Sequence, residues 1–471
     1  MNVIRKYNID IIIFLIALFL RLVIFGMVAH NRDYNYESFT ADGYYEVAVS
    51  MVKYHVSPNL AILASTPNSL RTPGLPIIIV PFIYFFNSVF GFIILQIIIS
   101  SLIPVISRRL ALAVNLPVIF SNLIGFFMAV DVLGISLSMP IITETFFTFF
   151  LLLAVFYLVK LLRIISLGRK FFTENRPYGL VALCGFLLGV ATLMRPTLIY
   201  FPLLMAMVWI IYSYKAKIKE FLKYTLVFLL ASYLILTPWF YRNYKVFHVV
   251  GYSSIKEQVL YSTLVPSILA IKNHQSYNQA QKEFFLAQGF NKSPDVNLDE
   301  AAWFKRQAIK VIYNNPVYFL ESATISLYTF FTHDGALNLL SQLKLDNGYL
   351  NYPHGLSFFK QSFHGLIISL ADLAGSPLAL VLLFRLFWIL TAVCFMMSLV
   401  YQAVKKGFNI YSGFFLVLIL YFALTTIANG LGVNARFRYP VNALILIFVI
   451  QGWQAWLNEY RSKKLSVLEC S

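Results

Sequence analysis

IDIIIFLIALFLRLVIFGMVA, residues 9–29, decides the class of this protein, because it is one long and almost wholly apolar run. A helix needs about 20 apolar residues to cross the roughly 30 Å hydrocarbon core of a bilayer. Similar runs recur along the 471 residues, of which 59% are hydrophobic and 12% charged, with a mean hydropathy of +0.73. Long continuous runs favour helices over barrel strands, which are short and alternate in polarity. The sequence therefore predicts an all-α polytopic membrane protein.

About ten runs are long enough to span a membrane, so with two weaker ones we expect a bundle of about 10–12 transmembrane helices. The ten predicted spans are residues 9–29, 92–107, 110–130, 141–162, 178–194, 197–214, 224–239, 378–401, 414–428 and 439–456. The two weaker runs, 75–86 and 317–331, are short enough to be re-entrant, interfacial or tilted.

The placement of Lys and Arg predicts the orientation, because cytoplasmic loops carry an excess of both. Short basic loops alternate with less basic ones and lie at 5–6, 108–109, 163–176, 215–223, 405–406 and 461–464. We therefore expect a multi-pass membrane protein with both termini cytoplasmic and the first span retained. The net charge of +17 is explained by topology and by contact with membrane lipids, and no aromatic-basic motif favours nucleic acid.

The same orientation places the polar parts of the chain outside. We expect a transmembrane catalytic core over 1–252 with a first external loop at 30–73. An external, partly helical region with a possible additional span follows over 253–376, and C-terminal helices and a tail occupy 377–471. Carriers usually have internal repeats with working residues at mid-membrane, and this chain has no visible repeat. The sequence thus predicts external chemistry.

Asp42 is the first candidate for that chemistry. It lies in TADGYYE, residues 40–46, shortly after the first span, and we expect it to open a helix whose apolar face lies on the membrane. An Asp in a first helical turn is also favoured by the helix dipole alone, so a catalytic base and a dipole-stabilising residue are both open interpretations. Tyr45 and Glu46 are auxiliary candidates, because Glu46 would share the face of Asp42 one turn later.

Arginines at external membrane edges are the second unusual feature. Positive residues there run against the orientation rule, which suggests an anionic partner, and guanidinium groups suit phosphate. The alternative is that each one snorkels to lipid head groups or ends a helix. The set comprises Arg71, Arg195, Arg242 with its neighbour Asn243, Arg436 and Arg438.

Glu144 opens an otherwise apolar span in SMPIITET, residues 138–145. The helix dipole again explains a first-turn Glu, but a carboxylate at the edge of hydrocarbon is also a functional candidate. No metal site is predicted, because His333, Asp334 and His354 fit no zinc spacing. Whether a divalent cation acts as a cofactor is left open by the sequence.

The order of these motifs resembles a known family. After Asp42 come RTPGLP at 71–76, Glu144, GFLLGVATLMRP at 185–196, TPWFYRNY at 237–244 and RFRYP at 436–440. This order resembles the bacterial branch of the protein O-mannosyltransferase and aminoarabinose transferase superfamily, membrane glycosyltransferases of the GT-C fold. The likeness covers most of the chain but not the polar stretch 253–315.

The resemblance implies transfer of a monosaccharide from a polyprenyl-phosphate donor to a glycan, lipid or protein acceptor on the external face. By position, Asp42 would be the essential first-loop carboxylate and Glu144 the second acidic residue. Family members often have Asp-Glu where this chain has Asp42-Gly43, and Glu46 could replace the missing acid. The family's Lys- or His-Pro-Pro motif is Arg71-Thr72-Pro73 here.

The chemistry agrees with these residues independently. A sugar phosphate already has a good leaving group if cations stabilise the departing phosphate, and a positioned carboxylate can deprotonate the acceptor hydroxyl. One base and one phosphate clamp predict a single displacement with inversion. Two other functions remain open: a glycan polymerase or ligase that uses a diphosphate-linked donor, and a transporter of lipid-linked saccharides.

Overall fold

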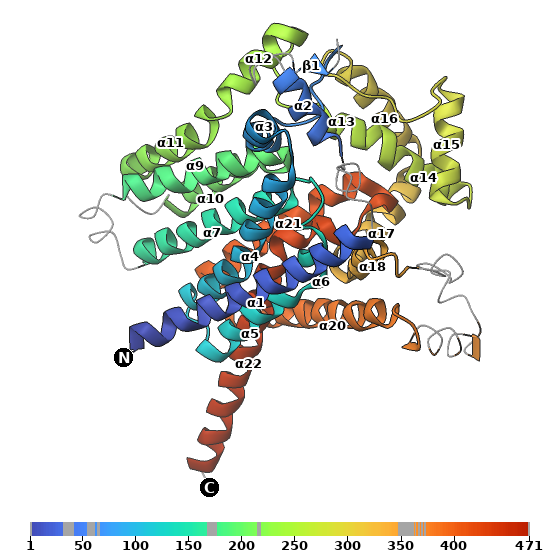
Figure 1. The fold of residues 1–471 in the computed structure, drawn as a ribbon. Coiled ribbons are helices and arrows are strands. Elements are labelled where there is room, and N and C mark those ends of the chain that lie inside the picture. Colours follow the sequence, from blue (N-terminus) through green and yellow to red (C-terminus); the bar gives the residue numbers. More distant parts are fainter. Residues whose placement is uncertain are drawn as a thin grey trace.

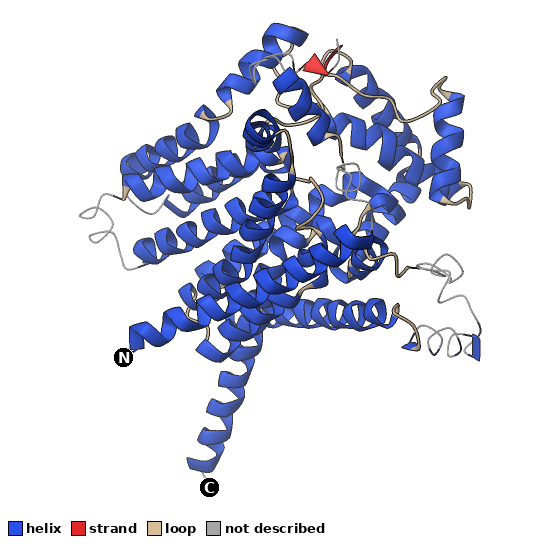
Figure 2. Cartoon of the chain, viewed as in Figure 1, coloured by secondary structure: helices blue, strands red, loops and turns tan. Residues whose placement is uncertain are grey.

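The computed structural model describes residues 2–31, 42–53, 62–63, 66–166, 177–213, 218–346 and 374–469, together with scattered positions between 362 and 371. Within these residues the regular secondary structure is helical apart from two short antiparallel strands, β1 (Ile62–Leu63) and β2 (Thr66–Pro67) (Figure 2). The predicted all-α polytopic membrane architecture is confirmed.

Six helices of the described chain contain stretches long and apolar enough to cross a membrane. They are α1 (Asn2–Asn31), α4 (Phe90–Ala113), α7 (Glu144–Ser166), α20 (Ala379–Tyr401), α21 (Ile410–Thr426) and α22 (Asn442–Glu469). A seventh span results if α11 (Ile218–Leu234) and α12 (Thr237–Phe247), which are bent by 51°, act as one. Four further apolar helices are shorter: α3 (Gly74–Phe86), α5 (Val118–Val130), α9 (Tyr178–Met194) and α10 (Phe201–Ser213).

The run 110–130, expected to be one span, is instead divided between the end of α4 and the whole of α5. Asn115 between them has a left-handed backbone with a φ of 62°. Pro117 then precedes α5, and the residue before a proline is disfavoured in helical conformation. Local turn chemistry therefore ends the helix although hydrophobicity continues.

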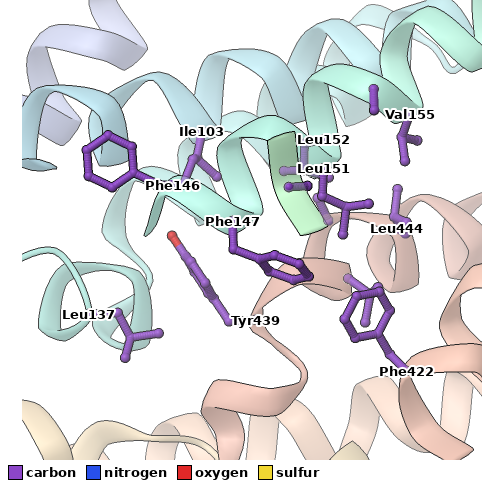
Figure 3. Packing of buried hydrophobic residues seen from close by; sticks show 14 of the residues in the cluster. Ile103, Leu137, Phe146, Phe147, Leu151, Leu152, Val155, Phe422, Tyr439 and Leu444 are labelled. Carbon is purple, nitrogen blue, oxygen red and sulfur yellow. The ribbon is translucent and has the colours of Figure 1, made fainter. Parts of the chain in front are cut away.

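Helix α7 lies at the centre of the bundle and packs against α4 and α9. In its apolar stretch 67% of the residues are buried, against 17% in α20, which identifies α20 as peripheral. Figure 3 shows Phe147 of α7 between Tyr439 and Phe422, which come from the last third of the chain. The core therefore joins the first and last parts of the sequence around α7.

Glycines allow α9 and α11 to approach closely. A Cβ atom on Gly185 would lie 2.4 Å from the carbonyl oxygen of Phe228, and one on Gly189 would lie 2.5 Å from that of Ser232. Small residues that bring backbones together are typical of helix interfaces in membranes. The GFLLG part of the 185–196 motif therefore serves packing.

The polar stretch 253–315 forms a group of short helices with its own small apolar core. They are α13 (Ile255–Val259), η4 (Leu260–Leu264), α14 (Val265–Lys272), α15 (Tyr277–Ala287) and α16 (Ala301–Asn314). Together with α2 (Tyr44–Lys53) they lie at one end of the molecule, away from both chain termini (Figure 1). This group and the loop at 68–72 form a common framework, because Ser69 N–H donates to Asn297 Oδ1 and Ser253 Oγ donates to the carbonyl of Leu70.

The remaining elements are one longer helix and several short segments. They are α6 (Val132–Ser136), η3 (Pro196–Leu198), α17 (Pro316–Thr332), α18 (Ala336–Gln342), η7 (Gln402–Lys406), η8 (Ile427–Gly432), η9 (Ala435–Phe437) and η10 (Tyr439–Val441). The weaker run 317–331 is the single helix α17, which packs against α20 and η8. The short turns η8 to η10 therefore lead the chain from α21 back into α22.

Candidate functional site

A cavity of about 890 Å³ opens at the end of the bundle that carries α2, α13 and α16. Its lining comes from elements far apart in the sequence, including the turn before α2, the start of α7 and the turn η9. Five of the residues singled out in the sequence line it together: Asp42, Arg71, Glu144, Arg195 and Arg436. The structure therefore gathers half of the ten predicted site residues in one place.

Four of these side chains form a chain of alternating charge. Arg436 Nη1 donates to Asp42 Oδ2 at 3.2 Å, and its Nε lies 3.6 Å from Glu144 Oε1. Arg195 Nη1 donates to the same Glu144 oxygen at 3.2 Å. The nearby Glu144 carboxylate chiefly raises the pKa of Arg436, burial lowers it, and Asp42 raises it further. Arg436 is thus firmly cationic and links the two carboxylates.

Glu144 is the most buried member of this chain, with a side chain only 1% exposed. Both guanidinium groups meet its Oε1, whereas Oε2 has no hydrogen-bond partner within the described residues. A buried polar atom left without a partner usually costs about 1–3 kcal/mol. Glu144 lines the cavity, but this oxygen is itself buried, so the carboxylate contributes to the cavity by holding Arg195 and Arg436.

Asp42 reaches the cavity from a strained turn. Asp42 and Gly43 both have positive φ, 62° and 76°, and α2 begins only at Tyr44. Asp42 therefore does not open the helix but precedes α2 by two residues, so it still lies beside the helix N-terminus. Asp tolerates this left-handed conformation better than most residues. Its side chain is 30% exposed, so it is held by Arg436 and remains accessible.

Arg71 and Arg195 are positioned by their neighbouring residues. Arg195 precedes Pro196, is extended, and ends α9. Thr72 Oγ1 donates to the carbonyl of Met194 at 2.8 Å, which ties the Arg71 loop to the end of α9. A Cβ on Gly74 would lie 2.5 Å from the carbonyl oxygen of Leu193, so glycine is required for this close approach. The Arg-Thr-Pro-Gly and Arg-Pro motifs therefore build one wall together.

Arg242 and Asn243 do not line the cavity. Arg242 is buried, stacks over Trp239, and donates to the carbonyl of Asn68 and to Asn243 Oδ1. Asn243 Nδ2 in turn donates to the carbonyls of Gly251 and Tyr252, both at 2.9 Å. These side chains hold the loops behind the cavity in place.

Arg438 is also placed away from the cavity and is fully buried. It donates to the carbonyls of Phe330 and His333 at 2.8 and 2.6 Å, and its guanidinium lies 3.6 Å from the ring centre of Trp388. These carbonyls belong to the end of α17, where a cation is favourable. Arg438 therefore joins α17 to the start of the last span.

The auxiliary candidates on α2 lie beside the cavity and do not line it. Glu46 is exposed, and Tyr45 is partly buried against the main core. A Cβ on Gly43 would lie 3.9 Å from Glu46 Oε2 and 4.0 Å from Arg71 Nε. Glu46 and Arg71 therefore both lie next to Gly43, although only Arg71 lines the cavity.

A second group of polar residues, which the sequence did not point to, lines the other part of the cavity. Lys256 Nζ donates to the hydroxyl of Tyr200 at 3.1 Å and lies 3.4 Å from Glu257 Oε1. Lys305 of α16 lines the same part. Both lysines lie in the stretch 253–315. The only signal for them in the sequence is the adjacent pair Lys256-Glu257 on the first helix of that stretch.

The lining carries a net positive charge and a broad apolar wall. Five cationic and three acidic side chains line the cavity, which gives a formal net charge of +2. Exposed apolar side chains on α10, α21 and the loop after α12 form the wall: Leu203, Val249, Val250 and Leu424. The cavity thus combines an anion-attracting interior with a surface suited to a hydrocarbon chain.

No group of three or more His, Cys, Asp or Glu side chains that could hold a metal ion occurs in the described part of the chain, and His354 lies outside it. Comparison of the sequence and structure with protein-family models, curated proteins and solved structures found no match.

Proposed function

We propose that this protein is a membrane glycosyltransferase that moves a monosaccharide from a polyprenyl-phosphate donor to an acceptor hydroxyl. The main observation behind the proposal is that an accessible carboxylate, Asp42, lies among arginines and beside an apolar wall in one and the same cavity. A base, a cationic phosphate site and a surface for the prenyl chain are the three things that this reaction requires.

In the proposed reaction the acceptor oxygen attacks the anomeric carbon of the sugar, and the bond from that carbon to the phosphate oxygen breaks. Asp42 takes the hydroxyl proton, and the bonding electrons leave with the phosphate, so one displacement inverts the anomeric centre. A positioned general base contributes roughly 10²–10⁴-fold to such a step. The salt bridge to Arg436 orients the Asp42 carboxylate before substrate arrives.

Arg71 is the leading candidate for the donor phosphate. Within the described residues no carboxylate forms an ion pair with it, whereas Arg195 and Arg436 already share Glu144. Its guanidinium instead lies 5.5 Å from the ring centre of Tyr44. Arg195 and Arg436 stand close enough in the same lining to stabilise charge that develops on the leaving group.

The distribution of basic residues supports an external site. Arg108, Arg109 and Arg163 lie toward the opposite ends of α4 and α7 from the cavity, and basic residues favour the cytoplasmic side. We therefore place the cavity on the outer face of a bacterial cytoplasmic membrane and both termini in the cytoplasm.

The part of the cavity around Lys256, Lys305 and Tyr200 is left for the acceptor. The same lysines favour one alternative, a polymerase or ligase with a diphosphate-linked donor, because a second phosphate would need additional cations. The two functions differ in what these lysines bind: the acceptor in the transferase, and the second donor phosphate in the polymerase or ligase.

The test incubates purified protein with radiolabelled polyprenyl-phosphate monosaccharides and a mixed panel of glycan, lipid and peptide acceptors. We expect wild type and the Glu46→Gln variant to transfer sugar, and Asp42→Asn to bind donor without transferring it. Glu46 is the matched control because it is a nearby carboxylate outside the cavity lining.

Full transfer by Asp42→Asn would refute the catalytic assignment. Activity of wild type only with diphosphate donors would establish the alternative. Scrambling of lipid-linked saccharide by protein in liposomes, without any transfer, would identify a transporter.

A further inference from the structure

Two buried tyrosines line the cavity, and their hydroxyl groups are used differently. Tyr44 is 6% exposed and Tyr252 is 4% exposed. The Tyr252 hydroxyl donates to the carbonyl of Thr192 at 3.0 Å. In a regular helix the N–H four residues later would bind that carbonyl, but Pro196 has no N–H. Tyr252 therefore satisfies a carbonyl that the end of α9 leaves open.

The Tyr44 hydroxyl has no such role in the fold. Its ring packs in the main apolar core, which fixes its position. No residue of the described chain forms a hydrogen bond with its hydroxyl, and the phenol oxygen is not enclosed by these residues as Glu144 Oε2 is. Phenylalanine would fill the same space in the core. The hydroxyl group therefore needs an explanation on the cavity side.

The charged end of the cavity surrounds this hydroxyl. The Arg71 guanidinium lies 5.5 Å from the ring centre of Tyr44. Burial raises the pKa of Tyr44, Arg71 opposes this effect, and Asp42 raises the pKa again. Arg195 and Glu144 act on the same group more weakly. The Tyr44 hydroxyl therefore stays protonated at neutral pH and can donate a hydrogen bond beside Arg71.

We propose that the Tyr44 hydroxyl donates a hydrogen bond to the phosphate of the polyprenyl carrier, next to Arg71. This inference rests on the proposed glycosyltransferase function and adds a substrate-binding residue to it. Phosphate oxygens are acceptors, and a phenol and a guanidinium are both donors. Tyr44 is also the first residue of α2, where the positive end of the helix dipole favours an anion. A phosphate bound there lies close to Asp42, two residues earlier in the chain.

Binding of undecaprenyl phosphate, a carrier without sugar, tests this hydrogen bond separately from the reaction. In isothermal titration of the detergent-solubilised full-length protein, Tyr44→Phe should weaken binding about 10–150-fold, the equivalent of about 1.5–3 kcal/mol for a hydrogen bond to a charged group. Its melting temperature should be unchanged, because the ring stays in the core.

Tyr252→Phe is the matched control, since it removes a hydroxyl that already has a partner. It should lower the melting temperature and bind the carrier as tightly as wild type. Equal affinity of wild type and Tyr44→Phe would overturn the inference. An equal loss of affinity in both variants would overturn it as well, because it would show a general disturbance of the cavity.

Sugar transfer by wild type, measured in parallel, separates this inference from the proposed function. Transfer by wild type together with normal carrier binding by Tyr44→Phe would keep the transferase and remove the role of Tyr44. Carrier binding that depends on Tyr44, without transfer from any donor, would keep the phosphate site and remove the transferase. Wild type that binds no polyprenyl phosphate would overturn both.

Discussion

Replacing Glu144 by glutamine tests whether this buried carboxylate holds the cavity together. Its Oε1 lies 3.2 Å from Arg195 Nη1 and 3.6 Å from Arg436 Nε. Removing one partner of a buried ion pair usually costs about 3–5 kcal/mol, because the remaining charge stays buried. The side chains of Arg195 and Arg436 are 15% and 31% exposed, and Arg436 would keep its ion pair with Asp42. We therefore expect a loss near the lower end, about 3 kcal/mol of unfolding free energy.

Reversible unfolding in mixed detergent and SDS micelles measures this loss. The control Glu46→Gln should change the unfolding free energy by no more than about 0.5 kcal/mol, as is usual for exposed sites. The double variant Glu144→Gln/Arg195→Gln should show a coupling of about 1–3 kcal/mol between the two sites. A loss below about 1 kcal/mol for Glu144→Gln would match an exposed ion pair and would refute the reasoning.

Three further predictions concern the donor, the acceptor and the packing. Arg71→Gln should weaken binding of a polyprenyl-phosphate sugar by about 1.5–3 kcal/mol in isothermal titration. Arg242→Gln should chiefly lower thermal stability. Lost binding in Arg242→Gln with lost stability in Arg71→Gln would exchange their assigned roles. Lys305→Gln should raise the KM for acceptor and leave donor affinity unchanged; weaker donor binding would favour the diphosphate alternative. Gly189→Ala should destabilise the protein by about 1–3 kcal/mol, because its Cβ would meet a backbone oxygen of α11 at 2.5 Å. The control Gly179→Ala should not destabilise the protein, because the space around its Cβ is open. Equal losses of stability for the two variants in thermal unfolding would contradict the packing argument.

The apolar runs predicted the membrane architecture well, because length and composition alone determine whether a helix can cross a bilayer. They did not predict where helices stop. The run 110–130 breaks at Asn115 through local backbone geometry while its hydrophobicity continues. The segment 253–315 showed helical patterning, but its position against the loop at 68–72 depends on hydrogen bonds between residues some 180 to 230 positions apart.

The site was partly predictable for a chemical reason. Ionisable residues at the edge of hydrocarbon are costly, so Asp42, Glu144 and Arg436 stood out before any pairing was known. Their pairing could not be foreseen, since Asp42 and Arg436 are 394 positions apart. Arg438 stood out for the same reason and yet binds backbone carbonyls. Sequence alone cannot distinguish these cases, because what separates them is which acceptors the fold brings within reach.

The charge of the cavity favours the proposed transition state over the bound donor. A polyprenyl phosphodiester carries one negative charge, whereas the departing phosphate monoester carries about 1.5 to 2 at pH 7. During the reaction one negative charge leaves Asp42, which takes up the proton, and appears on the phosphate. Arg436, bound to Asp42 at the start, is then free to turn toward the phosphate while Glu144 still holds its other side. Interactions that strengthen as charge moves in this way raise the rate, whereas those already complete in the ground state do not.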